Sequence, residues 1–333
     1  MEKPHLCKII SESYQTILLL LRQSTVPVLF SALCISANVH YPALQSPQTF
    51  LIMGWQKRLL KACSNAPLLP ICKDTPLVLI SDCHRGIGNS NDNFLKNQHL
   101  YFAALSYYYR KGYTYIELGD GDELWENRHL KDIQEIHGNV FWLLEQFHCN
   151  HRLYMLYGNH DMVKRTPSPL LSYPCFESLM LQDTSTHHCF LLVHGHQADT
   201  LNSAFWRLSR FMVRYFWQPL EEFGVLDPTS AAKNYSVKGT TETRLEQWGK
   251  EHQITIIAGH THRSVLDGEH PYFINTGSCV HPRCITCIEI VHNSISLVKW
   301  SMEHRNDLSL YVARTLLSGP FPLQDFTESQ PEI

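Results

Sequence analysis

The chain has 333 residues, of which 44% are hydrophobic and 18% are charged. This composition is close to that of ordinary globular domains, so the chain can bury a sizeable core and is not expected to be disordered. Its formal net charge of −3 at pH 7 argues against a nucleic-acid-binding protein that relies on a strongly basic surface. We therefore expect a folded domain without a nucleic-acid partner.

The eleven cysteines form no evenly spaced framework of the kind that holds small secreted domains together. A reducing, cytoplasmic location is therefore expected. Cys284 and Cys287, with Cys279 nearby, have the Cys-x2-Cys spacing of zinc ligands. Structural zinc sites usually contain two such pairs, so we favour a strand with half-buried cysteines and keep zinc binding as the alternative.

The first seventy residues differ from the rest of the chain. Residues 16–39 are largely apolar, but Arg22, Gln23 and Ser24 interrupt them, so no apolar run is long enough for a membrane span. Only parts of a signal-peptide pattern are present. We assign residues 1–70 to an N-terminal extension of unclear role.

A regular alternation of strands and helices begins at Pro76. Short apolar runs predict strands over 77–80, 113–118 and 152–157, and helical spacing of apolar residues predicts helices between them, over 94–110 and 132–149. Strands that alternate with helices in this way pair in parallel. This part of the chain therefore predicts a parallel sheet.

The second half of the chain predicts more strands around a helical insert. Apolar runs over 188–193 and 254–258 predict two strands, and residues 272–275, 284–291 and 295–300 have the spacing of a terminal antiparallel meander. Together they favour a two-sheet α/β arrangement. The insert, residues 200–251, begins with an aromatic and arginine-rich stretch at 200–220. That stretch either packs on the sheet or contacts substrate or lipid as a peripheral membrane surface.

Polar side chains follow five of these apolar runs, at the point where each predicted strand ends. They are Asp82, His84, Asp120, Asn159, His194, His260 and His262. Carboxylate and imidazole ligands suit manganese, iron or zinc better than calcium. One Asp-x-His pair occurs by chance in many chains, but five such placements predict a metal site at one end of a sheet.

The motifs around these residues resemble those of the calcineurin-like metallophosphoesterase superfamily over about residues 76–300. In chain order they are Asp82-x-His84, Gly119-Asp120-x-x-Glu123, Gly158-Asn159-His160-Asp161, His194-Gly195-His196 and Gly259-His260-Thr261-His262. Within the superfamily, residues 119–125 and 194–199 are most similar to the UDP-2,3-diacylglucosamine pyrophosphatase-like branch. The resemblance implies a four-layer α/β/β/α sandwich over residues 71–305, followed by a tail at 306–333.

The resemblance also implies a pair of metal ions, each manganese, iron or zinc. Asp82, His84 and His262 would bind the first ion, Asn159, His194 and His260 the second, and Asp120 both. Two such ions, about 3.5–4 Å apart, hold a shared water as hydroxide and neutralise phosphate oxygens. Asp122 and Glu123 are expected to be supporting or surface carboxylates.

Four further residues are candidates for acid catalysis and substrate binding. His160 would donate a proton to the leaving oxygen, and Asp161 would orient its imidazole. Arg85 and Arg263 directly follow ligand pairs and are candidates for binding phosphate oxygens, with surface ion pairs as the alternative.

We expect hydrolysis of a phosphoester or pyrophosphate bond in a small phosphorylated substrate, such as a nucleotide-sugar or a lipid-linked diphosphate. The pyrophosphatase-like branch often has arginine where this chain has His160, a difference that favours a broader phosphodiesterase or phosphatase. The alternatives are a non-catalytic metal-binding scaffold, a nuclease and a protein phosphatase. A nuclease would be expected to have a basic groove, which the sequence does not indicate.

Overall fold

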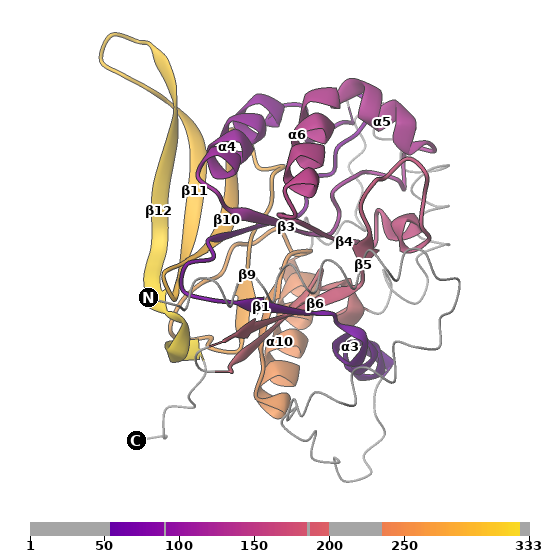
Figure 1. Cartoon of the computed structure of the whole chain (residues 1–333), viewed down its shortest axis with the longest axis vertical. Helices are drawn as coiled ribbons and strands as arrows, with labels where there is room; N and C mark the ends of the chain where they lie inside the picture. Colours follow the sequence, from indigo (N-terminus) through magenta and orange to yellow (C-terminus); the bar gives the residue numbers. More distant parts are fainter. Residues whose placement is uncertain (1–53, 90, 185–186, 200–234, 327–333) are drawn as a thin grey trace. The chain divides into compact units, whose positions relative to one another are not determined.

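The structure is a computed structural model that describes residues 54–89, 91–184, 187–199 and 235–326. Two β-sheets form the centre of the described part (Figure 1). One sheet has seven strands in the order β12-β11-β10-β2-β3-β4-β5, and the other has five in the order β1-β6-β7-β8-β9.

The seven-stranded sheet combines a parallel half with an antiparallel half. Its strands are β2 (Leu77–Ile80), β3 (Thr114–Leu118), β4 (Leu153–Leu156), β5 (Cys175–Phe176), β10 (Cys284–Val291), β11 (Ser294–His304) and β12 (Leu310–Pro322). Strands β2 to β5 pair in parallel, as the alternation of strands and helices predicts. Strand β10 pairs antiparallel with both β2 and β11.

The five-stranded sheet carries the later histidine-rich segments. Its strands are β1 (Leu68–Ile71), β6 (Ser178–Asp183), β7 (Cys189–Val193), β8 (Thr255–Ala258) and β9 (Phe273–Asn275). Strands β7, β8 and β9 are parallel, whereas β6 pairs antiparallel with β7. The parallel strands of both sheets therefore supply carboxyl ends at which polar side chains can gather.

Three apolar clusters show that the layers alternate as helix, sheet, sheet and helix. The cluster between the sheets includes Leu79 from β2 and Leu192 from β7. On the outer face of the seven-stranded sheet, α4 (Gln98–Arg110) and α6 (Gly138–Cys149) pack against residues such as Tyr115. On the outer face of the five-stranded sheet lie α3 (Gly54–Asn65) and α10 (Tyr235–His252). The predicted four-layer α/β/β/α sandwich is confirmed.

Two predicted elements differ from those observed. The helix expected over 132–149 is two helices, α5 (Leu130–Ile136) and α6, which meet at His137, whose imidazole is buried beside Asp92. The meander expected from residue 272 onward is also different, because β9 pairs in parallel with β8 in the five-stranded sheet. Phe273 and Ile274 are buried on opposite faces of the five-stranded sheet. Both side chains therefore reach apolar surroundings when the segment joins this sheet.

The segments at the two ends of the predicted domain contribute to the sheets. Residues 306–333, assigned to a tail, include β12, which pairs with β11 from Ser294 to His304. Residues 1–70, assigned to an extension, include α3 and the start of β1, which pairs with β6. Of the predicted insert, residues 200–234 lie outside the described residues, and α10 follows them. None of the helices among the described residues has the length and hydrophobicity needed to cross a bilayer.

The packing of α3 predicts that this helix stabilises the domain. Leu59 is fully buried in the cluster that α3 shares with Trp248 and Leu191. Replacing Leu59 with alanine should lower the free energy of unfolding by about 2–5 kcal/mol, because it leaves a cavity. Leu60→Ala, on the half-buried side of the same helix, is the matched control. Equal losses in the two variants, measured by urea denaturation, would contradict this packing.

Candidate metal centre

The seven side chains predicted to bind metal all follow the carboxyl ends of strands. Asp82 and His84 follow β2, Asp120 follows β3, Asn159 follows β4, His194 follows β7, and His260 and His262 follow β8. The backbone links the ends of these strands: the Asp82 N–H donates to Gly119 O, and the His260 N–H donates to the Asp82 carboxylate at 2.9 Å. Both sheets thus deliver their polar residues to one place.

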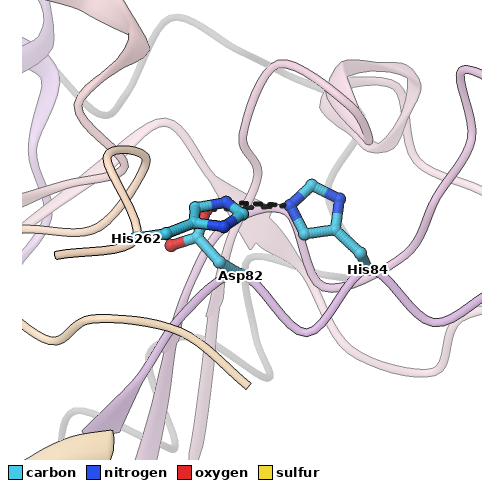
Figure 2. A group of neighbouring side chains, drawn as sticks. All are labelled: Asp82, His84 and His262. Carbon is cyan, nitrogen blue, oxygen red and sulfur yellow. Dashed lines mark hydrogen bonds and ion pairs between the residues drawn. The ribbon is translucent and has the colours of Figure 1, made fainter. Parts of the chain in front are cut away.

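One group of ligand atoms contains Asp82, His84 and His262, all lying within 4.8 Å of one another. Figure 2 shows the two imidazoles facing each other beside the carboxylate. The Nε2 atoms of His84 and His262 are 3.3 Å apart, and His262 Nε2 lies 3.1 Å from Asp82 Oδ1. This arrangement brings together the three residues that the sequence assigns to the first ion.

A second group contains Asp120, His194 and His260, again within 4.8 Å of one another. His194 Nε2 lies 3.1 Å from Asp120 Oδ2. The Oδ1 atom of Asn159 is buried and has no hydrogen-bond partner among the described residues. Asp120 also belongs to a further group with His84 and His160, so its carboxylate is shared between the two halves of the centre.

The hydrogen bonds of two imidazoles leave their Nε2 atoms available for a proton or a metal ion. His194 Nδ1 lies 2.8 Å from the carbonyl oxygen of Leu118, which can only accept, so Nδ1 carries the proton. Its Nε2 therefore directs a lone pair at Asp120 unless it binds a second proton or a metal ion. The same holds for His84, whose Nδ1 bonds the Glu123 carboxylate at 2.8 Å. Nitrogen and oxygen donors of this kind fit divalent transition metal ions.

The pKa values of these groups reflect the close contact of imidazoles and carboxylates. Burial disfavours protonation of His84, but the Glu123 hydrogen bond and nearby carboxylates outweigh it and raise the pKa to about 10. For His194, burial is likewise outweighed by Asp120, and the pKa rises to about 9. Burial would raise the pKa of Asp120, yet the surrounding imidazoles hold it well below its usual value. The centre is thus a buried negative site that retains cations.

Glu123 holds two histidines at once. Its Oε2 lies 2.8 Å from Nδ1 of His84 and its Oε1 lies 2.8 Å from Nδ1 of His160. The His160 ring also stacks on Trp125 at a centroid distance of 4.2 Å. Of the two alternatives predicted for Glu123, the structure agrees with a supporting carboxylate and not with a surface one, because the side chain is buried and bonds both rings.

The expectation that Asp161 orients His160 is wrong, because the Asp161 carboxylate bonds other groups. It accepts the Gly158 N–H at 2.7 Å and the Gly121 N–H at 3.1 Å, and Lys164 Nζ lies 2.7 Å away. Asp161 therefore ties together the loops that follow β3 and β4. Its contribution to the centre is to hold these loops in place.

Arg85 is also placed differently from its prediction as a substrate-binding residue. Its side chain is fully buried, with Nη1 and Nη2 bonded to Glu117 at 2.9 and 2.7 Å and Nε bonded to Asp122 at 2.6 Å. All of these nitrogens bond carboxylates, so Arg85 cannot bind phosphate in this arrangement. Its backbone carbonyl accepts the Glu123 N–H, so Arg85 instead fixes the loop that carries Glu123.

Arg263 stays a candidate for substrate binding. Its side chain is 58% exposed and forms an ion pair with Glu242 on α10. Glu242 is buried and also accepts a hydrogen bond from Thr261, so it holds the loop between His260 and His262 to that helix. Sequence analysis did not identify Glu242. It also missed Asp199, whose Oδ2 lies 3.4 Å from His260 Nε2.

The backbone of the centre adopts conformations that are unfavourable for L-residues. Five predicted ligands have positive φ angles: Asp82 (52°), His84 (48°), Asp120 (48°), His260 (68°) and His262 (58°). Each such conformation costs about 1 kcal/mol or more. Close approach also demands glycine at two positions. A Cβ at Gly158 would lie 2.2 Å from Asp120 Oδ1, and one at Gly259 would lie 2.5 Å from Asp82 Oδ2.

The cysteines are not part of any possible metal site found among the described residues, since the groups of ligand atoms there contain only aspartate and histidine. Cys279 and Cys287 are buried in the core, and Cys284 and Cys287 lie on β10 as the favoured strand interpretation predicts. Cys287 Sγ lies 3.2 Å from the hydroxyl of Tyr108.

Comparison with known proteins agrees with this geometry. A model of the calcineurin-like phosphoesterase family matches residues 75–264, which include every predicted ligand. Comparison with curated proteins found no match. Among solved structures, Vps29 from Chaetomium thermophilum is 12% identical, with a TM-score of 0.36 over 73% of this chain and 95% of its own. A cold-active protein tyrosine phosphatase variant is 14% identical, with a TM-score of 0.37 over 76% and 83%.

Metal binding should release protons and should strengthen as pH rises. The raised pKa values of His84 (about 10) and His194 (about 9) mean that both imidazoles carry an extra proton at pH 7 in the metal-free protein. A metal ion must displace these protons, so apparent Mn²⁺ affinity should increase from pH 6 towards pH 9. Calorimetry in buffers of different ionisation enthalpy would count them. The control is His99→Gln, which replaces an exposed histidine. Two results would contradict this account: no proton release at all, or a proton release that is unchanged in His194→Gln but altered in His99→Gln.

Replacing Glu123 with glutamine should affect both histidines that it holds. Glutamine is uncharged and has one acceptor oxygen where glutamate has two, so it supports the two imidazoles less strongly. We expect Mn²⁺ affinity to fall about 10–100-fold, as for other residues that orient metal ligands. The control is Glu135→Gln, whose side chain is 65% exposed. Unchanged affinity in Glu123→Gln, measured by calorimetry, would show that these hydrogen bonds do not position His84.

Proposed function

We propose that this chain, which belongs to the calcineurin-like phosphoesterase family, hydrolyses a phosphoester or diphosphate bond using two divalent transition metal ions. The observation that carries the proposal is the position of Asp120. Its buried carboxylate belongs both to the group with His194 and His260 and to the group with His84 and His160. A carboxylate shared in this way is suited to hold two ions close together.

The chain offers a nearly complete ligand set for each ion. We assign Asp82, His84 and His262 to the first ion, Asn159, His194 and His260 to the second, and Asp120 to both. When bound, two such ions supply an activated water and neutralise charge on the phosphate. Manganese, iron and zinc all suit this set of nitrogen and oxygen donors.

His160 is the residue that we expect to donate a proton to the leaving oxygen. The Glu123 carboxylate bonds Nδ1 of His160, and Trp125 stacks on the ring, so both contacts limit the rotation of the imidazole. The side chain is 24% exposed, unlike the fully buried His194, so a substrate can reach it. A held imidazole that substrate can reach is suited to general acid catalysis.

The substrate that we propose is a small phosphorylated molecule. The resemblance to the UDP-2,3-diacylglucosamine pyrophosphatase-like branch supports a nucleotide-sugar or a lipid-linked diphosphate. His160, where that branch often has arginine, supports a broader phosphodiesterase or phosphatase. Residues 200–220, through which membrane contact is predicted, lie outside the described residues, and cytoplasmic location stays a prediction.

The proposal is tested by replacing His160 with alanine. Hydrolysis of a phosphodiester with Mn²⁺ should slow about 10²–10⁴-fold, the range expected for general acid catalysis. The loss should be greatest for a dialkyl ester, whose leaving group needs a proton, and smaller for bis-p-nitrophenyl phosphate, whose leaving group needs little help. Mn²⁺ content should stay the same, since His160 is not assigned as a ligand.

The matched control is His304→Ala, an exposed histidine outside the centre. Equal losses of hydrolysis rate for the two substrates would show that His160 is not the general acid. Such a result would not contradict metal-dependent hydrolysis. A parent protein that binds Mn²⁺ but hydrolyses none of a panel of monoesters, diesters and nucleoside diphosphate conjugates would contradict the proposed activity.

A further inference from the structure

Strand β12 leaves a long edge on the seven-stranded sheet. It spans Leu310–Pro322 and is the terminal strand in the sheet order. The other three terminal strands in the described part are short: β5 has two residues, β9 three and β1 four, with Pro70 among them. Short edges and proline are common ways to prevent strand pairing between molecules. β12 is long, and its prolines, Pro320 and Pro322, lie only at its end, so its first part lacks both kinds of protection.

The hairpin of β11 and β12 (Figure 1, yellow and light orange) carries many of the exposed large hydrophobic side chains among the described residues. Of the eleven exposed large hydrophobic side chains among the described residues, six lie here: Met302, Leu308, Leu310, Tyr311, Leu316 and Leu317. Leu310 is 69% exposed and its neighbour Tyr311 is 38% exposed, so both faces of the strand are uncovered at this point. A two-stranded ribbon with apolar side chains on both faces is marginally stable in water without a partner.

The regular part of β12 has defined ends and contains one charged residue. Its pairing with β11 is uninterrupted from Leu310 to Leu316, and the register shifts directly after that. Arg314 is the one charged residue in this segment, and its Nε bonds Glu289 on β10 at 2.8 Å. A charge or a proline on the segment would oppose pairing with another strand. The segment contains no proline, and its one charged side chain is paired with Glu289 of the same chain.

The segment also suits pairing with itself. Its central residue is Ala313, so an antiparallel arrangement about Ala313 places Leu310 opposite Leu316 and Tyr311 opposite Thr315. Apolar and β-branched or aromatic cross-strand pairs of this kind stabilise sheets. No charged side chain meets its own copy in this register, because Arg314 lies opposite Val312.

We propose that β12 pairs with β12 of a second copy of this chain, antiparallel about a two-fold axis at Ala313. The two seven-stranded sheets then continue into one another through the residues Leu310–Leu316. Such an interface is isologous, since the same surface serves both subunits. It places Leu310 and Leu316 in cross-strand pairs and gives hydrogen-bond partners to the backbone groups of the segment that point away from β11.

The first test is the mass of the full-length protein in solution. Light scattering coupled to size exclusion should give twice the chain mass of 38.5 kDa. Leu316→Lys should shift the protein to the monomer at the same concentration, with an unchanged melting profile of the monomer fold. Leu170→Lys is the matched control, because Leu170 has the same 46% exposure as Leu316 but lies in a different part of the structure.

The second test is disulfide cross-linking at the proposed axis. Directly opposite residues of antiparallel strands have Cα atoms about 4.5–5.5 Å apart, which suits a disulfide. Ala313→Cys should therefore form a covalent dimer under mild oxidation, above the level of the parent with its native cysteines. Thr315→Cys should not, because Thr315 faces Tyr311 in this register.

Three results would overturn the proposal. One is a parent protein that stays monomeric at high concentration, and another is a dimer that survives Leu316→Lys. The third is a monomer that sediments with anionic vesicles in a manner sensitive to Leu316→Lys, which would assign the hairpin to a lipid surface. Cross-linking of Thr315→Cys in place of Ala313→Cys would contradict the register.

Discussion

The meeting of lone pairs at the junction of the two sheets is the constraint on which the rest of this structure depends. His194 Nε2 faces Asp120 at 3.1 Å, and His84 Nε2 faces His262 Nε2 at 3.3 Å. A lone pair on His194 Nε2 repels the Asp120 carboxylate at this distance unless the nitrogen binds a proton or a metal ion. For the same reason, at least one of the facing Nε2 atoms of His84 and His262 must bind a proton or a metal ion. The centre therefore holds protons or metal ions. Burying these side chains without such cations would destabilise the fold.

The surrounding structure holds the side chains of the centre in place in several ways. Asp161 joins the loops after β3 and β4, and Arg85 joins the loop after β2 to β3 and to the loop that follows it, all through buried hydrogen bonds and ion pairs. Five ligands at positive φ add strain that only a tightly packed environment can sustain. Glu123 joins the proposed metal ligand His84 to the proposed acid His160, so the proposed metal binding and catalysis share one carboxylate.

The strands that carry the candidate ligands, and the gathering of those residues at one place, could be predicted from the sequence because both depend on local patterns. A buried strand such as β2 is a short apolar run, and the polar residue that ends it is visible directly after it. Partners from distant parts of the chain could not be predicted in this way. An exposed and a buried arginine look alike in sequence, so Arg85 was assigned to substrate, and nothing local shows that Glu123 rather than Asp161 bonds His160. Strand β9 was placed in the wrong sheet for the same reason.

The most direct test of the two-ion centre is anomalous X-ray diffraction from crystals of the protein loaded with Mn²⁺, recorded on both sides of the manganese absorption edge. The account predicts two anomalous peaks about 3.5–4 Å apart, with the Asp120 carboxylate in contact with both and Asn159 Oδ1 in contact with one. A single peak, or peaks that do not contact Asp120, would contradict it.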